Sequence, residues 1–265
     1  MPLNNIQKSM NLPKLLNMLL SFFNIKLINK KFGGVVDKRE LLPFQEGNEN
    51  LRLYYEGLKK SENTHADNFF KQSRFLDLIN LTEKLLQNQE NQIFDFVECG
   101  CWTGHSSYII SKLIKKYNKD IKFHIFDSFE GLSSNIENDE HLKNLSSDEL
   151  KRIRKQFSSN EDFVKHEVLK DFKFIKTYKG WIPEKFFLVE NNKFSLIHID
   201  VDLYEPTLKS LEFFYPRLVE GGIIVCDDYN SKHFSGSKKA WDEFFSNKKL
   251  KVNFSPSLGS SFIIK

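Results

Sequence analysis

The sequence predicts an α/β fold with a mostly parallel β-sheet that has helices on both faces. From residue 66 onward, short apolar runs alternate with stretches of helical periodicity. The runs are apolar along their whole length, as expected for parallel strands buried on both sides. Two final runs joined by a turn add one antiparallel strand. At 265 residues, with 40% hydrophobic and 28% charged residues, the chain is long enough for one sizeable core.

The elements follow in a regular order. Residues 66–87 form the first helix, because apolar side chains recur at 75, 76, 78, 79, 81, 85 and 86. Five strands are expected at 93–98, 121–127, 172–180, 194–200 and 221–227, and two more within 250–265. Helices are expected at 105–117, 139–157 and around 238–246, and one starts at Pro206, a residue favoured at the first helical position.

The first 65 residues are expected to form a helical and irregular extension to a main domain at 66–265. Residues 1–36 hold five lysines and no acid around the apolar stretch 15–23, which is too short to span a bilayer. This stretch is expected either to lie weakly on a membrane surface or, in the favoured interpretation, to pack on the domain or on a partner subunit. Residues 41–57 are expected to be irregular.

Charge and cysteine content exclude some classes of protein. The net charge of +4 comes without a long basic run, so no nucleic-acid partner is expected. Cys99, Cys101 and Cys226 are odd in number and lie in or beside predicted strands. They are expected to be reduced structural residues of a cytoplasmic protein.

Acidic residues follow four of the predicted strands. Glu98, Asp127 and Asp200 each close one strand, and Asp227 with Asp228 closes another. Parallel strands present their carboxyl ends at one crevice, where ligands bind. Buried acids that lie together require a cation or a proton to compensate them.

The turn after the first strand reads Glu98-x-Gly100-x-x-x-Gly104. Glycines let the backbone approach a bound cofactor closely, and the helix that follows offers free N–H groups. The spacing after Gly100 is one residue longer than in the dinucleotide fingerprint. It is typical of turns that receive S-adenosylmethionine, and Asp127 stands where an acid accepts hydrogen bonds from ribose hydroxyls.

Five motifs occur in a familiar order, namely VECGCWTGHSS, HIFDSFEGL, KGWIPE, HIDVDLYEPT and GGIIVCDDY. Together they resemble the macrocin O-methyltransferase-like family, which methylates sugar hydroxyls in tylosin, mycinamicin and novobiocin biosynthesis. The resemblance covers about residues 70–245. It implies a Rossmann-like class I methyltransferase with a seven-stranded sheet, dependent on S-adenosylmethionine and on Mg²⁺ or another divalent cation, and a homo-oligomer.

The resemblance also implies roles for individual residues. The metal ligands are Asp200, Asp227 and Asp228. The catalytic residues are Asp202, as general base, and Asp200. The residues expected to bind the cofactor are Glu98, Gly100, Gly104, Ser106, Asp127, Ser128, Trp181 and Asp200. For Trp181, lining the pocket and packing in the core remain open.

The expected activity is methyl transfer to a sugar hydroxyl, in surface-polysaccharide or secondary-metabolite (antibiotic) biosynthesis. Two alternatives remain: a methyltransferase of a small catechol-like diol, which uses the same metal chemistry, and a scaffold protein that binds the cofactor without turnover. A further alternative, a metal-dependent hydrolase, would have no affinity for S-adenosylhomocysteine.

Other conspicuous residues receive a structural interpretation first. Glu205 is expected to cap the next helix, His198 to be a core histidine, and Arg74 to be structural or to contact another subunit. Tyr204 is left open between lining the acceptor pocket and packing, and His105 between contacting the cofactor and opening the helix. The charged insert at 133–165 is a solvated helical face or a lid over the acceptor site.

Overall fold

The structure is a computed structural model that describes residues 28–29, 34–35, 49–63, 67–88, 92–231, 234–246, 248, 253–254 and 260–265. The predicted segment 15–23 lies outside the described residues. Within them, no helix is both long and apolar enough to cross a bilayer.

The described part of the chain contains a seven-stranded sheet in the order β5-β4-β3-β6-β7-β9-β8. The five parallel strands are β3 (Asp95–Cys99), β4 (Phe123–Asp127), β5 (Ile175–Lys179), β6 (Phe194–Ile199) and β7 (Leu218–Cys226). The antiparallel additions are β9 (Ser261–Ile264), which pairs with β7, and β8 (Asn253–Phe254). This arrangement confirms the predicted class I methyltransferase sheet. A separate two-stranded antiparallel sheet is formed by β1 (Ile28–Asn29) and β2 (Gly34–Val35).

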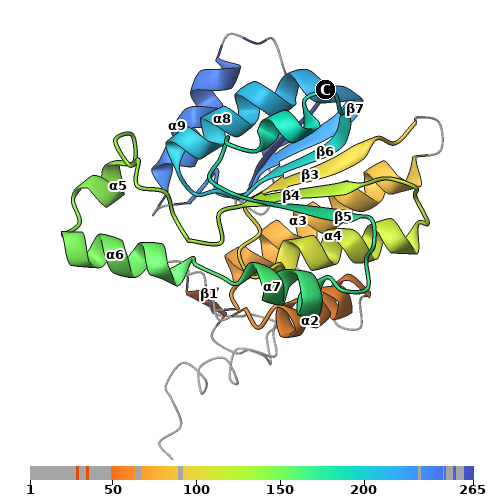
Figure 1. The fold of residues 1–265 in the computed structure, drawn as a ribbon, viewed down its shortest axis with the longest axis horizontal. Helices are drawn as coiled ribbons and strands as arrows, with labels where there is room; N and C mark the ends of the chain where they lie inside the picture. Colours follow the sequence, from red (N-terminus) through yellow and green to blue (C-terminus); the bar gives the residue numbers. More distant parts are fainter. Residues whose placement is uncertain are drawn as a thin grey trace, which may run out of the picture.

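Helices cover both faces of the sheet (Figure 1). One face carries α2 (Glu49–Lys60), α3 (Phe69–Gln87) and α4 (His105–Lys116), and the other carries α8 (Tyr204–Phe214) and α9 (Ser235–Phe245). Strand residues alternate between the two layers. Phe96 packs in the cluster that includes α3 and α4, whereas its neighbour Val97 packs in the cluster that includes α8 and α9.

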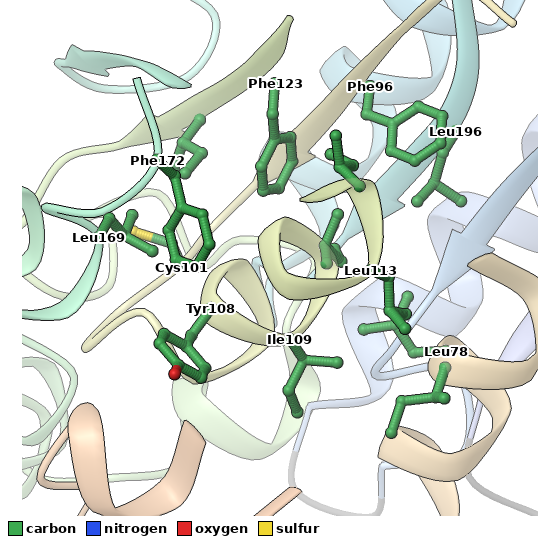
Figure 2. Packing of buried hydrophobic residues seen from close by; sticks show 14 of the residues in the cluster. Leu78, Phe96, Cys101, Tyr108, Ile109, Leu113, Phe123, Leu169, Phe172 and Leu196 are labelled. Atoms are coloured by element: carbon green, nitrogen blue, oxygen red, sulfur yellow. The ribbon is translucent and has the colours of Figure 1, made fainter. Parts of the chain in front are cut away.

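The core on the α4 side shows why these helices form where they do. Phe96, Phe123 and Leu196 project from three strands towards Ile109 and Leu113 of α4 (Figure 2). Ile109 and Leu113 are four residues apart, which places both side chains on one side of α4. The predicted helix at 105–117 and the strands around it are therefore confirmed.

The prediction that residues 41–57 are irregular was wrong for its second half, because α2 begins at Glu49. Leu53 and Tyr54 of α2 are buried in the α4-side core, and Gly57 lies against His105. The high density of polar residues concealed a helix that is stabilised by this tertiary packing.

Smaller elements follow β4 and β5. The insert contains α5 (Glu140–Lys143) and α6 (Ser147–Gln156), which project from one side of the sheet (Figure 1). The insert also contains α7 (Glu161–Phe163), and a π-helical turn, η1 (Val164–Val168), spans its end. Two 3₁₀ turns, η2 (Phe186–Val189) and η3 (Tyr215–Arg217), precede β6 and β7.

Candidate active site

A cleft opens at the carboxyl ends of β3, β4 and β6. Chain order reverses between β3 and β6, the position where open α/β sheets bind ligands. The cleft contains about 560 Å³ of empty space, a volume that includes the solvent at its open mouth. Its lining residues are Gly100, Trp102, Phe126, Asp127, Ser128, Gly131, Leu132, Ser133, Phe157, Trp181, Ile182, Asp200, Val201, Asp202 and Pro206.

Gly100 sits where the first turn touches the end of β6. Its φ is +84°, and a Cβ at this position would lie 1.9 Å from the backbone oxygen of Asp200. Only glycine tolerates both the left-handed backbone and this contact. The backbone N–H of Gly100 donates to Phe126 O at 2.8 Å, and that of Asp200 donates to Cys99 O at 2.8 Å. These bonds hold the turn level with the ends of the neighbouring strands.

Asp127 holds the same turn from β4. Its Oδ2 accepts the backbone N–H groups of Cys101 at 2.7 Å and Trp102 at 2.9 Å, and its Oδ1 accepts that of Phe129 at 2.6 Å. Burial raises the pKa of Asp127, and the three backbone donors oppose that effect. The carboxylate thus fixes the turn and also lines the cleft.

Three carboxylates gather beside the cleft. Asp200, Asp227 and Asp228 each offer one oxygen, and these oxygens lie within 4.8 Å of one another. The backbone N–H of Asp227 donates to Ile199 O at 2.9 Å, so the ends of β6 and β7 are held together. Burial, followed by the charges of Asp227 and Asp228, raises the pKa of Asp200 well above its usual value.

This donor set fits a divalent cation. Carboxylate oxygens are hard ligands that suit Mg²⁺, which keeps several waters and needs few protein ligands. Mutual repulsion among buried carboxylates is the condition that a bound cation relieves. The fit rests on the spacing, burial and chemistry of the three oxygens.

Asp202 stands apart from the three-acid cluster. Its φ of +59° is left-handed and turns the chain away from β6, so that the side chain lines the cleft. Its backbone N–H donates to Asp228 Oδ2 at 2.9 Å. Burial and then the charges of Asp228 and Asp200 raise the pKa of Asp202 well above its usual value. A general base works best when its pKa lies near the operating pH, and burial shifts this carboxyl in that direction.

Arg74 reaches the acids from α3. Its guanidinium donates to Asp227 Oδ2 and lies 3.6 Å from Asp228 Oδ1. Burial raises the pKa of Asp227, but Arg74, the next largest influence, brings it below the usual value. The sequence did not reveal this contact, because an arginine in an amphipathic helix gives no indication of which strand end it faces.

A group of buried polar side chains lies on the α4 side of the sheet, next to the three acids. Glu98 is fully buried, accepts from Ser107, and bonds His198 Nδ1 at 2.9 Å. His198 Nε2 lies 3.8 Å from Asp227 Oδ1, too long for a hydrogen bond but close for an ion pair. Burial lowers the pKa of His198, but the two neighbouring acids outweigh it and raise that pKa to about 10. His198 is thus a core histidine, as predicted, that joins two acids.

The charged insert is docked on α8 and α9. Buried Asp139 accepts the backbone N–H of Tyr204 at 3.2 Å, and Lys239 donates to Asn138 at 3.0 Å. The prediction that Glu205 caps α8 is wrong, because Glu205 instead accepts from Asn135. The capping acid comes from 65 residues earlier in the chain, which local sequence cannot show. The helix also begins at Tyr204, two residues before Pro206.

Most of the predicted site residues converge. Gly100, Asp127, Ser128, Trp181, Asp200 and Asp202 line the cleft, and Asp227 and Asp228 join Asp200 beside it. Glu98, Gly104 and Ser106 are not among the lining residues.

Of the residues left open by the sequence, Trp181 lines the cleft, whereas His105 and Tyr204 are not among the lining residues. His105 stacks on Phe75 with ring centroids 4.1 Å apart, and Tyr204 donates to Glu243 at 2.5 Å. The three cysteines are buried and unpaired.

Comparison with known proteins agrees with this geometry. A family model described as macrocin-O-methyltransferase (TylF) matches residues 59–256, about three quarters of the chain. The chain belongs to the macrocin O-methyltransferase family. Family membership confirms the resemblance drawn from the five motifs.

Two curated relatives carry names that describe sugar chemistry or antibiotic chemistry. A tetracenomycin 4'-O-methyltransferase from Streptomyces olivaceus, whose name specifies a dimethoxy-rhamnosyl group, is 27% identical over 145 residues. Demethyldecarbamoylnovobiocin O-methyltransferase from Streptomyces niveus is 25% identical over 148 residues. Each match spans 51% of this chain and 52% of the relative, so the chain spans about half the length of the curated relatives it matches.

Solved structures share the fold. The O-methyltransferase NovP superposes with a TM-score of 0.61 at 18% identity, covering 79% of this chain and 87% of NovP. The calicheamicin methyltransferase CalS11 superposes with a TM-score of 0.57 at 15% identity, covering 86% of this chain and 97% of CalS11.

Proposed function

We propose that this chain is a Mg²⁺-dependent O-methyltransferase that transfers the methyl group of S-adenosylmethionine to a sugar hydroxyl. The observation that carries the proposal is the meeting of Asp200, Asp227 and Asp228 beside a cleft that also holds Asp202. The family and the rhamnosyl group in the name of the tetracenomycin relative support a sugar or glycoside acceptor. Antibiotic or surface-polysaccharide biosynthesis is the corresponding setting.

The methyl donor is assigned to the part of the cleft formed by the first turn. Gly100 leaves room for close approach, Asp127 and Ser128 supply polar groups at the end of β4, and Trp181 supplies an aromatic wall. Glu98, Gly104 and Ser106 are assigned a supporting role. Glu98 holds Ser107 in α4, and Gly104 starts that helix at a φ of +86°.

The acids supply the chemistry of proton removal. A sugar hydroxyl is a poor nucleophile near neutral pH. A divalent cation held by the three-acid cluster would lower the pKa of acceptor hydroxyls bound to it. Asp202 takes the hydroxyl proton as the acceptor oxygen forms its bond to the methyl carbon and the sulfur–methyl bond breaks. The walls of the cleft contribute by aligning the two reactants.

The test is methyl transfer from labelled S-adenosylmethionine to a panel of free sugars, nucleotide sugars and glycosides. Wild-type protein is expected to methylate at least one acceptor with Mg²⁺ and none with excess EDTA. Asp200→Asn should abolish transfer while S-adenosylhomocysteine still binds. Full activity of Asp200→Asn in EDTA would overturn the metal assignment. Binding of S-adenosylhomocysteine without transfer to any acceptor would favour the scaffold alternative, and transfer only to catechols would favour the diol alternative.

Two further assignments belong with the proposal. Residues 1–65 are expected to contribute contacts between subunits or to the acceptor site, in a homo-oligomer. The insert at 133–165 is expected to form one wall of the acceptor site, since its residue Phe157 lines the cleft.

A further inference from the structure

We propose that Arg74 is a built-in counter-ion of the acid cluster, which stabilises the metal-free protein and lowers its affinity for the divalent cation. The inference rests on the proposed function, because it assumes that Asp200, Asp227 and Asp228 hold the cation. It extends that function by naming the residue that sets how tightly the cation is held.

The geometry brings a permanent positive charge onto two of the three ligands. The Arg74 guanidinium bonds Asp227 Oδ2 and lies 3.6 Å from Asp228 Oδ1. About a quarter of the Arg74 side chain is exposed, whereas Asp227 and Asp228 are 7% and 6% exposed. An arginine stays charged under all ordinary conditions. The acids therefore have a partner that does not depend on metal supply.

The positions of these residues follow from strand alternation. Ile223, Val225 and Asp227 alternate onto the side of β7 that faces α3 and α4, as do Leu196, His198 and Asp200 on β6. Arg74 lies in α3, which contacts both strands. Phe75, the next residue of α3, packs against the α4-side core and stacks on His105, so the helix is fixed close to the acids.

Formal charges show what the guanidinium accomplishes. Three carboxylates and one guanidinium carry a net charge of −2, which one divalent cation neutralises. His198 lies between Glu98 and Asp227 and is shared by both acids, so it does not replace Arg74. Without Arg74, the cluster has a net charge of −3 and attracts a divalent cation more strongly.

Loss of Arg74 should therefore lower the stability of the metal-free protein and raise its affinity for the cation. In metal-free protein, loss of Arg74 leaves buried carboxylates without their partner, which destabilises the fold. In the presence of Mg²⁺, loss of Arg74 removes a like charge beside the cation and tightens binding. If Arg74 only oriented Asp227, its loss would misplace that ligand and would weaken Mg²⁺ binding instead.

The experiment is isothermal titration of metal-free protein with MgCl₂, together with thermal unfolding in EDTA and in saturating Mg²⁺. Arg74→Gln should bind Mg²⁺ about tenfold more tightly than wild type. In EDTA, Arg74→Gln should unfold at a lower temperature than wild type. Saturating Mg²⁺ should raise the unfolding temperature of Arg74→Gln by more than it raises that of wild type. Arg74→Lys keeps the charge and should stay within about threefold of the wild-type affinity.

Arg217→Gln is the matched control. Arg217 stacks on Phe213 and donates to the backbone oxygens of Glu190 and Phe213, with no carboxylate among these contacts. Its loss should leave Mg²⁺ affinity unchanged. Unchanged or weaker Mg²⁺ binding by Arg74→Gln, with normal binding by wild type, would overturn the inference alone. Absence of Mg²⁺ binding by wild type would overturn the metal assignment as well as the inference.

Discussion

Replacing Gly100 by alanine tests whether the turn after β3 and the end of β6 at Asp200 form one rigid unit. The added Cβ would lie 1.9 Å from the backbone oxygen of Asp200, so one of the two segments must move by about 1 Å or more. A left-handed φ costs about 1–2 kcal/mol for alanine, and forced repacking costs about 1–3 kcal/mol more. The expected loss in unfolding free energy is therefore about 2–5 kcal/mol.

Gly104→Ala isolates the backbone part of this effect. Gly104 has a similar φ of +86°, but its added Cβ would meet only the side chains of Val164 and Val168, no nearer than 3.3 Å. Its expected loss is about 1–2 kcal/mol. Urea denaturation gives the stabilities, and Mg²⁺ titration reports whether Asp200 has shifted. Gly100→Ala should weaken Mg²⁺ binding more than Gly104→Ala. Equal stabilities and equal affinities for the two variants would refute the argument.

Three more predictions address other parts of the account. Burial lowers the pKa of His105 to about 3, so the unfolded chain, with a histidine pKa of about 6.5, takes up the proton first and stability falls as the pH drops below that value. The loss from this residue at pH 4.5 is about 2–3 kcal/mol, and His105→Gln should flatten the slope measured by urea denaturation at each pH; an unchanged slope would contradict it. Asp139→Ala should remove the cap of α8, lower stability by about 1 kcal/mol and speed limited proteolysis of the insert, whereas Glu205→Gln, at an exposed contact, should change neither; equal proteolysis of both variants would argue against the docking role. Asp202→Asn should lower kcat about 10²–10⁴-fold with S-adenosylhomocysteine affinity intact, and near-normal turnover would remove Asp202 as the base.

The sheet was predictable from the sequence because its signals are local. Each buried strand is a short apolar run, and core helices such as α4 show apolar residues at helical spacing. The meeting of Asp200, Asp227 and Asp228 was predictable for a related reason. Acids that directly follow parallel strands must meet at one edge, whatever the details of packing.

The remaining features depend on contacts between distant segments. Arg74 meets Asp227 across 153 residues, and Asp139 caps a helix 65 residues later. Neither position carries a local signal, since an arginine in a helix and an acid in a charged stretch are ordinary on a protein surface. The helix α2 was missed for the same reason, because tertiary packing of residues such as the buried Tyr54 stabilises it.

The central claim is that Asp200, Asp227 and Asp228 hold a divalent cation beside the methyl donor. The most direct measurement is an anomalous difference map from crystals grown with Mn²⁺ and S-adenosylhomocysteine. The account predicts one strong peak at coordination distance from an oxygen of each of the three acids, with S-adenosylhomocysteine in the cleft between Gly100 and Trp181. A map with S-adenosylhomocysteine bound and no peak between the three acids would contradict it.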